Sequence, residues 1–281
     1  EITRLVLFAE TDKPIFSSSE NKPYLSRYPG DDSPAYIQIK YNTGKFVNEV
    51  LREKKYGLHI RLFYLTQAFS SFHSEMQKSG YTRALAKKYF ATVKTDLLQI
   101  HSGFKAGKIR PNPVTAGSYW RSVFMLIFSR KADFQGFEID DKFEALCVKD
   151  DNSHAHFEKI YELICEYIQK YQKYIGKQKS QVYERYILVS LITKKFPYKK
   201  TEFNMTALLV ASMSTTAAIQ LMIWMHVGGQ STLSDEMLQK IIYRTEGLIG
   251  HSTKGIIDTL KEDPHMLMLE KYAEVFLDLF Y

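Results

Sequence analysis

The feature that most restricts the fold is a long stretch without a formally charged residue. It runs from Met205 to Val227 and reads MTALLVASMSTTAAIQLMIWMHV. A helix of this length could span a bilayer. However, the stretch includes Gln220, His226 and several Ser and Thr residues, and charged residues stand just before it. A helix that is apolar on all sides also suits the centre of a large helical bundle. We therefore expect a buried central helix and no membrane partner.

Most of the remaining sequence repeats apolar residues at steps of three and four, the spacing of one helix face. This pattern occupies 45–77, 81–104, 118–139, 156–175 and 180–193. The only alternating run, typical of a strand, is YIQIKY at 36–41. The sequence therefore predicts an all-α fold, a multi-helix bundle built around the central apolar helix.

Two segments rich in helix-breaking residues suggest how the chain is divided. Residues 9–35 contain four prolines and many Ser, Asp and Asn residues, so 1–44 reads as an extended, loop-rich arm. A second break, AGKIRPNPVTAG at 106–117, interrupts the helical region 45–281. That region is either one body or two sub-bundles divided near 106–117.

Charge and cysteine content bear on partners and compartment. The net charge is +7, from 38 basic and 31 acidic residues, and lysines occur in small scattered groups. Such groups indicate solvated helix faces, although a Lys-rich surface could also bind nucleic acid or an acidic protein. With only Cys147 and Cys165, no disulfide framework holds the fold, and we expect a cytoplasmic protein.

The segment RTEGLIGHSTKG offers the first candidate for chemistry. Arg244 and His251 stand seven positions apart, the Arg-x6-His spacing of one helical class of ribonucleases. Arg52 and His59 have the same spacing, so the pattern is not distinctive. A general acid–base histidine also needs a partner within hydrogen-bond reach, which spacing does not establish. We favour a helix end at 247–250, with His251 or the residue after it opening the next helix.

Cysteine and histidine spacing gives little support for a metal site. Cys147, His154, His156 and Cys165 do not match a common structural zinc pattern, and Cys165 falls on the inward face of an amphipathic helix. Nor does a Gly-rich loop follow a strand, so a Rossmann-type cofactor site has no support. We expect no metal in this chain.

In the C-terminal third of the chain, the order of the segments is more informative than any single motif. YERYILVSLITKKFPY is followed by the apolar helix, by the acidic helix start LSDEMLQ, and by a short segment with His and Ser. This order resembles the C-terminal region of the bacterial flagellin lysine-N-methylase family. The opening EITRLVLFAETDKP and the stretch RLFYLTQAF also resemble that family. The matching positions are Phe196, Pro197, Leu209, Val210, Ile219, Leu221, Leu233, Asp235, Ile242, Tyr243, His251 and Ser252.

The resemblance implies an enzyme that transfers methyl groups from S-adenosylmethionine to lysine side chains of flagellin. Family members also carry a cysteine-rich N-terminal segment, which could bind a metal or an iron–sulfur cluster. This chain opens where that segment would end, so we expect it to be the helical body of such an enzyme. Activity would then depend on joining the two parts, and any metal or cluster would belong to the missing segment.

Methyl transfer to lysine needs a neutral ε-amine in a dry, well-aligned site. Aromatic rings can shield the amine and face a sulfonium cation. Polar groups cluster at the helix junction near 244–251, so we predict Tyr243, Arg244 and His251 as catalytic residues.

The alternative is a helical module that binds nucleic acid or a protein through its lysines. Salt would distinguish nucleic-acid binding, because that affinity falls steeply with ionic strength.

Overall fold

The computed structural model describes residues 45–79, 84, 93–129, 137, 139–174, 186, 205–229, 233–250 and 253–261. Every regular element in these ranges is a helix, which confirms the predicted all-α class. The predicted arm at 1–44, its alternating run, and all of 180–193 except Tyr186 lie outside them. After a helical stretch at 45–52, the elements are α4 (Leu58–Ser79), α6 (Val93–Lys105), α7 (Pro113–Phe128), α8 (Asp141–Val148), α9 (His154–Tyr174), α11 (Met205–Gly229), α12 (Asp235–Thr245), the π-helix η2 (Glu246–Gly250) and α13 (Thr253–Lys261).

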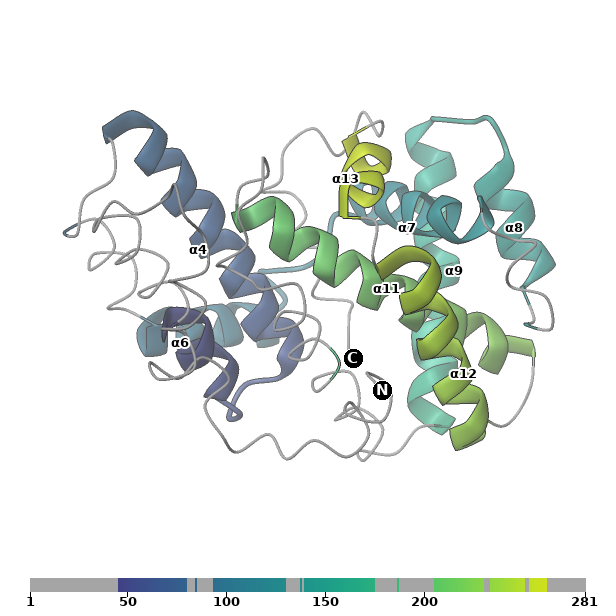
Figure 1. Ribbon diagram of the computed structural model, residues 1–281, viewed down its shortest axis with the longest axis horizontal. Helices are drawn as coiled ribbons and strands as arrows, with labels where there is room; N and C mark the ends of the chain where they lie inside the picture. The colour runs from purple at the N-terminus through teal and green to yellow at the C-terminus, as the bar shows by residue number, and fades with distance from the viewer. Residues whose placement is uncertain are drawn as a thin grey trace.

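The apolar helix α11 lies at the centre of this arrangement, as predicted. Its stretch Leu209–Val227 is long and apolar enough to cross a membrane, yet every residue of it is buried inside the protein. α11 contacts α4, α7, α9, α12, η2 and α13. In Figure 1 it runs through the middle, with α4 and α6 on one side and α7, α8 and α9 on the other.

Several buried hydroxyl groups on α11 have hydrogen-bond partners within the core, although Ser212 Oγ has none among the described residues. Thr215 Oγ1 donates to the carbonyl of Ala211, at 3.1 Å, one turn earlier on the same helix. The hydroxyls of Tyr119 on α7 and Ser214 on α11 are hydrogen-bonded at 3.1 Å. Burial also raises the pKa of Tyr119, so this phenol stays protonated. Because a buried polar group is tolerated when it is hydrogen-bonded, these residues are compatible with a central position.

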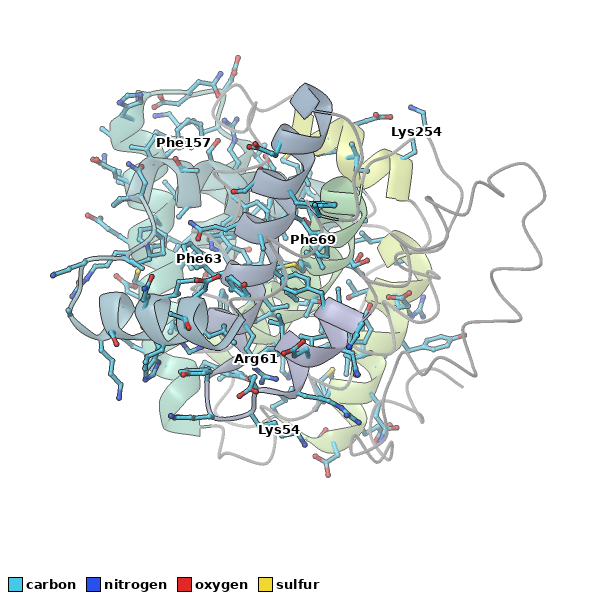
Figure 2. The ribbon with its side chains drawn as sticks, turned by 90° about the vertical axis from the view of Figure 1, so that its left-hand side faces the viewer. Lys54, Arg61, Phe63, Phe69, Phe157 and Lys254 are labelled. Carbon is cyan, nitrogen blue, oxygen red and sulfur yellow. The ribbon has the colours of Figure 1, made fainter. Side chains whose placement is uncertain are left out.

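The helices on either side of α11 present apolar faces toward it. On α4, Phe63 and Phe69 are buried, and Figure 2 shows them along the helix that faces the viewer. On the opposite side, the ring centroids of Trp120 from α7 and Trp224 from α11 lie 5.0 Å apart. The core is therefore continuous across α11.

The predicted break at 106–117 is confirmed for 106–112, which lie between two helices, whereas 113–117 already belong to the next helix. α6 ends at Lys105, and α7 begins at Pro113 with Asn112 as its N-cap. The Asn112 side-chain oxygen accepts from the backbone N–H groups of Val114 and Thr115 at 3.0 and 3.2 Å. α4 packs with α6, and α7 packs with α8 and α9. A division into two sub-bundles stays a prediction, since α11 contacts helices of both groups.

The backbones of α7 and α9 approach each other closely at Gly117. A Cβ atom at this position would lie 1.9 Å from the Phe157 carbonyl oxygen. Only a residue without a side chain allows the two helices to come this near. The glycine therefore sets the distance between α7 and α9.

Replacing Gly117 with Ala should destabilise the protein, because α7 and α9 would have to move apart. We expect the free energy of unfolding to fall by about 1–3 kcal/mol, the usual cost of overpacking. Urea unfolding followed by circular dichroism measures this change.

The matched control is Gly247→Ala, since nothing lies within 4 Å of a Cβ atom at Gly247. There the substitution should raise stability by about 0.5–1 kcal/mol through helix propensity. Equal responses of the two variants would contradict the role assigned to Gly117.

Candidate active site

The junction after α12 is a π-helical turn. Ser234 caps the start of α12, where its Oγ accepts from the Met237 backbone N–H at 3.1 Å. The chain continues past Thr245 as the π-helix η2, whose last residue, Gly250, lies within the expected helix end at 247–250. The next helix, α13, begins at Thr253. Single π-turns of this kind occur frequently at functional sites.

The three predicted catalytic residues lie in different settings. The side chain of Tyr243, near the end of α12, is 67% exposed. Arg244 is also exposed, while His251 lies outside the described residues. Tyr243 and Arg244 are therefore both at the surface, and the catalytic role of the three residues stays a prediction.

The turn also holds a buried carboxylate that the sequence reasoning missed. Glu246, the first residue of η2, is only 7% exposed. Its Oε2 accepts a hydrogen bond from the hydroxyl of Tyr186, which is itself buried. Arg61 is the only other Asp, Glu, Lys or Arg among the buried residues that the structure describes. A buried carboxyl group is tolerated when it is hydrogen-bonded, and Tyr186 provides that partner.

The backbone of η2 lies directly against this carboxylate. A Cβ atom at Gly250 would come within 2.3 to 2.5 Å of the Glu246 carboxyl carbon and oxygens. Gly247, by contrast, faces open space. On α12 just before the turn, the Thr245 hydroxyl is buried and has no hydrogen-bond partner. Since α11 packs against η2, the turn has one side in the core and one side at the surface.

A sequence signal for Glu246 did exist. Leu238, Ile241, Ile242, Thr245 and Ile249 are all buried, so one inward stripe continues from α12 into η2. Glu246 follows Ile242 by four residues and therefore falls on that stripe. An acidic residue at an inward position, with a glycine four residues later, indicates a buried carboxylate.

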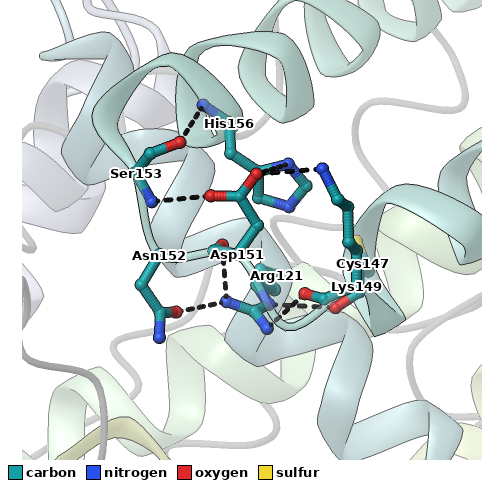
Figure 3. Close-up of polar contacts among 7 residues, drawn as sticks. All are labelled: Arg121, Cys147, Lys149, Asp151, Asn152, Ser153 and His156. Atoms are coloured by element: carbon teal, nitrogen blue, oxygen red, sulfur yellow. Dashed lines mark hydrogen bonds and ion pairs between the residues drawn. The ribbon is translucent and has the colours of Figure 1, made fainter.

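A second polar cluster joins α7 to the loop between α8 and α9 (Figure 3). Arg121 Nε donates to the Cys147 carbonyl at 2.9 Å, and Nη2 donates to the Lys149 carbonyl at 2.8 Å. Its Nη1 donates to Asn152 Oδ1 at 2.7 Å and to the Asp151 carbonyl at 3.4 Å. Because backbone carbonyls take most of these donors, the guanidinium serves to hold the loop in place.

Asp151 completes this cluster. Its carboxylate accepts from the Ser153 backbone N–H at 3.0 Å and from Lys149 Nζ at 3.0 Å, and His156 Nδ1 lies 3.8 Å away. The hydrogen bonds from Ser153, chiefly from its backbone, lower the pKa of Asp151, and Lys149 adds to the effect. A carboxylate that remains ionised and locally paired stabilises a loop and is poorly suited to proton transfer.

The four residues considered for zinc do not form a metal centre. In the described part of the chain, no group of three or more His, Cys, Asp or Glu residues could hold a metal ion. Cys147 is buried, and its thiol pKa is raised by desolvation. A neutral buried thiol is inert.

His59, part of the second Arg-x6-His pair, is held in its neutral form. Its ring packs against Phe104, with the centroids 5.2 Å apart. Burial, followed by the charges of His101 and Arg61, lowers its pKa from 6.5 to about 4. This histidine therefore fills space between α4 and α6.

Comparison with known proteins adds one finding. A family model described as the FliB lysine N-methylase C-terminal domain matches residues 45–269. The match covers every described helix, including η2 and Glu246. No curated protein and no solved structure matches the chain.

Acid should destabilise the fold through His59. Its folded-state pKa is lowered to about 4, so the unfolded chain binds a proton first as pH falls below about 6.5. The resulting stability loss begins there and is complete below about pH 4. Between about pH 7.5 and about pH 5, we expect the free energy of unfolding to fall by about 2 kcal/mol. Urea unfolding at each pH measures it.

The variant His59→Gln should lose most of this pH dependence. His154→Gln, at an exposed position near the start of α9, is the matched control and should keep it. If the free energy of unfolding of His59→Gln depends on pH as strongly as that of the unchanged chain, other groups cause the acid sensitivity.

Proposed function

Because this chain belongs to the family of FliB lysine N-methylase C-terminal domains, we propose that it is the helical body of a protein-lysine N-methyltransferase. In this proposal the enzyme transfers methyl groups from S-adenosylmethionine to lysine side chains of flagellin, in the cytoplasm. The observation that carries the proposal is the family match, which runs from the first described helix to beyond α13.

The π-turn supports a lysine-modifying role on physical grounds. An ammonium group must lose a proton before its nitrogen can attack a methyl carbon, and a site of low dielectric favours the neutral amine. η2 provides such surroundings on one side, because Ile249 and Gly250 are buried and α11 packs behind the turn. Its other side opens to the surface at Gly247, where a protein substrate can approach.

The described residues do not define a site for the methyl donor. They contain no strand that leads into a Gly-rich turn, the arrangement that binds adenine dinucleotides in Rossmann folds. We therefore assign no described residue to S-adenosylmethionine. The cysteine-rich segment expected upstream is a second part of the enzyme in this proposal.

Methyl transfer to flagellin tests the function directly. The chain, and a version joined to a cysteine-rich N-terminal segment of the family, are each incubated with flagellin and methyl-labelled S-adenosylmethionine. We expect label on flagellin lysines from the joined version, detected by peptide mass spectrometry. Flagellin with acetylated lysines is the control, because its amines cannot accept a methyl group. Absence of label from both versions, or label on other residues, would contradict the proposal.

A further inference from the structure

We propose that a basic surface, consisting of Lys55, Lys105, Lys108 and Arg110, binds an acidic segment of a partner protein, and that an apolar side chain of this segment packs on Leu98. The inference concerns binding alone and does not depend on the proposed methyl transfer. It follows from the positions of the four cations, from the way α6 ends, and from the exposed leucine on the same helix.

Ring contacts hold two separate segments of the chain side by side at the basic surface. The ring of Tyr56, in the turn before α4, meets the ring of His101 on α6, with the centroids 5.3 Å apart. Lys55 Nζ lies 5.8 Å from the centroid of the Tyr56 ring. Desolvation, followed by the charges of Lys105 and Lys55, lowers the pKa of His101, as expected when both lysines lie near it. Positive charge from both segments therefore gathers around this histidine.

The way α6 ends adds two more cations to the basic surface. Gly107, just after the helix, has a φ of 69°. The backbone N–H of Lys108 donates to the Gly103 carbonyl at 2.9 Å, a bond of the Schellman motif in which a glycine ends a helix. The Arg110 guanidinium lies against Gly107, because its Nη2 is 3.0 Å from the place of a Cβ atom there. Lys108 and Arg110 are therefore held near the end of α6.

The four cations face solvent, and the described residues give them no acidic partner. All four are exposed, and the ion pairs within the described part of the chain do not include them. The segment 105–110 contains no acidic residue, and the turn at 52–57 contains three cations against Glu53 alone. Figure 2 faces this side of the molecule and labels Lys54, the sequence neighbour of Lys55. Such an excess of positive charge attracts an acidic ligand.

An exposed leucine on α6 indicates that this ligand is a protein segment. Leu98 is 51% exposed and precedes Lys105 by seven residues. Both therefore lie on one face of α6, roughly 10 Å apart along its axis. Single-stranded nucleic acids bind on exposed aromatic rings, whereas Tyr56 is buried here and Tyr243 on α12 is the one exposed Phe, Tyr or Trp among the described residues. A peptide that carries acidic residues and an apolar side chain matches both features of the surface.

Helix stability alone explains only part of this arrangement. Lys105 lies in the last turn of α6, where a positive charge interacts favourably with the helix dipole. Lys55 belongs to a different segment and Leu98 is uncharged, so the dipole accounts for neither. A purely helix-stabilising role predicts that replacing Lys105 changes unfolding and leaves peptide binding as it was.

The experiment measures, by fluorescence anisotropy, binding of the full chain to a short labelled peptide in which glutamates flank one leucine. We expect binding at low ionic strength that weakens as salt is added. The double variant Lys55→Glu with Lys105→Glu should weaken binding about tenfold or more, and Leu98→Ser about threefold or more. The matched control is Lys142→Glu with Lys159→Glu, which makes the same charge change at exposed positions of α8 and α9. Its affinity should change by less than about twofold.

Circular dichroism shows whether each variant folds. If Lys105→Glu disrupts α6, the double variant Lys55→Glu with Arg110→Glu decides the question, because both positions lie outside the helices. Absence of peptide binding at low ionic strength would overturn the inference. An equal loss of affinity in the control at Lys142 and Lys159 would overturn it as well.

Two further ligands separate a protein partner from a nucleic acid. A single-stranded oligonucleotide of similar net charge, and the same peptide with Ser in place of Leu, are measured under the same conditions. Tighter binding of the oligonucleotide, or equal binding of the two peptides, would overturn the assignment of a protein segment. A preference for the leucine peptide that Leu98→Ser removes would support it.

Discussion

Burial of the uncharged helix α11 is the constraint on which the rest of the structure depends. The stretch Leu209–Val227 has no side exposed to water, so other helices must cover it on every side. α4, α7, α9, α12, η2 and α13 do so, and they come from sequence positions both before and after α11. α9 and α12 alternate buried and exposed positions, so one apolar face is enough for them, whereas residues 60–66 of α4 are all buried. The central helix therefore accounts for the apolar faces of the helices that pack on it.

The same constraint places the candidate site. η2 packs against α11, which accounts for the inward stripe that carries Leu238, Ile242 and Ile249. Glu246 lies on this stripe and becomes a buried carboxylate, held by a tyrosine far away in the sequence. Close backbone packing contributes in two places. Gly117 brings α7 against α9, and Gly250 lets the carboxylate rest on the turn itself.

Much of the helical pattern could be predicted, and the exceptions have physical causes. The expected helix at 156–175 corresponds to α9, His154–Tyr174. The short α8 was missed, although Asp140 caps it by accepting from the Phe143 backbone N–H at 3.0 Å. Eight residues carry too few turns for a periodic signal. Two glycines in close succession predict a helix end at 247–250, but a linear pattern does not show that the chain first makes a π-helical turn there.

From the sequence alone it followed that the chain is all-α, that an uncharged helix lies at its centre, and that its family is that of the flagellin lysine N-methylases. These properties depend on local spacing and on the absence of charge, which a linear pattern records. Tertiary structure decided which polar groups meet. Tyr186 and Glu246 are 60 residues apart, and Arg121 reaches carbonyls 26 and 28 residues away. Such contacts depend on how helices cross around α11, and that geometry arises only when distant side chains pack together.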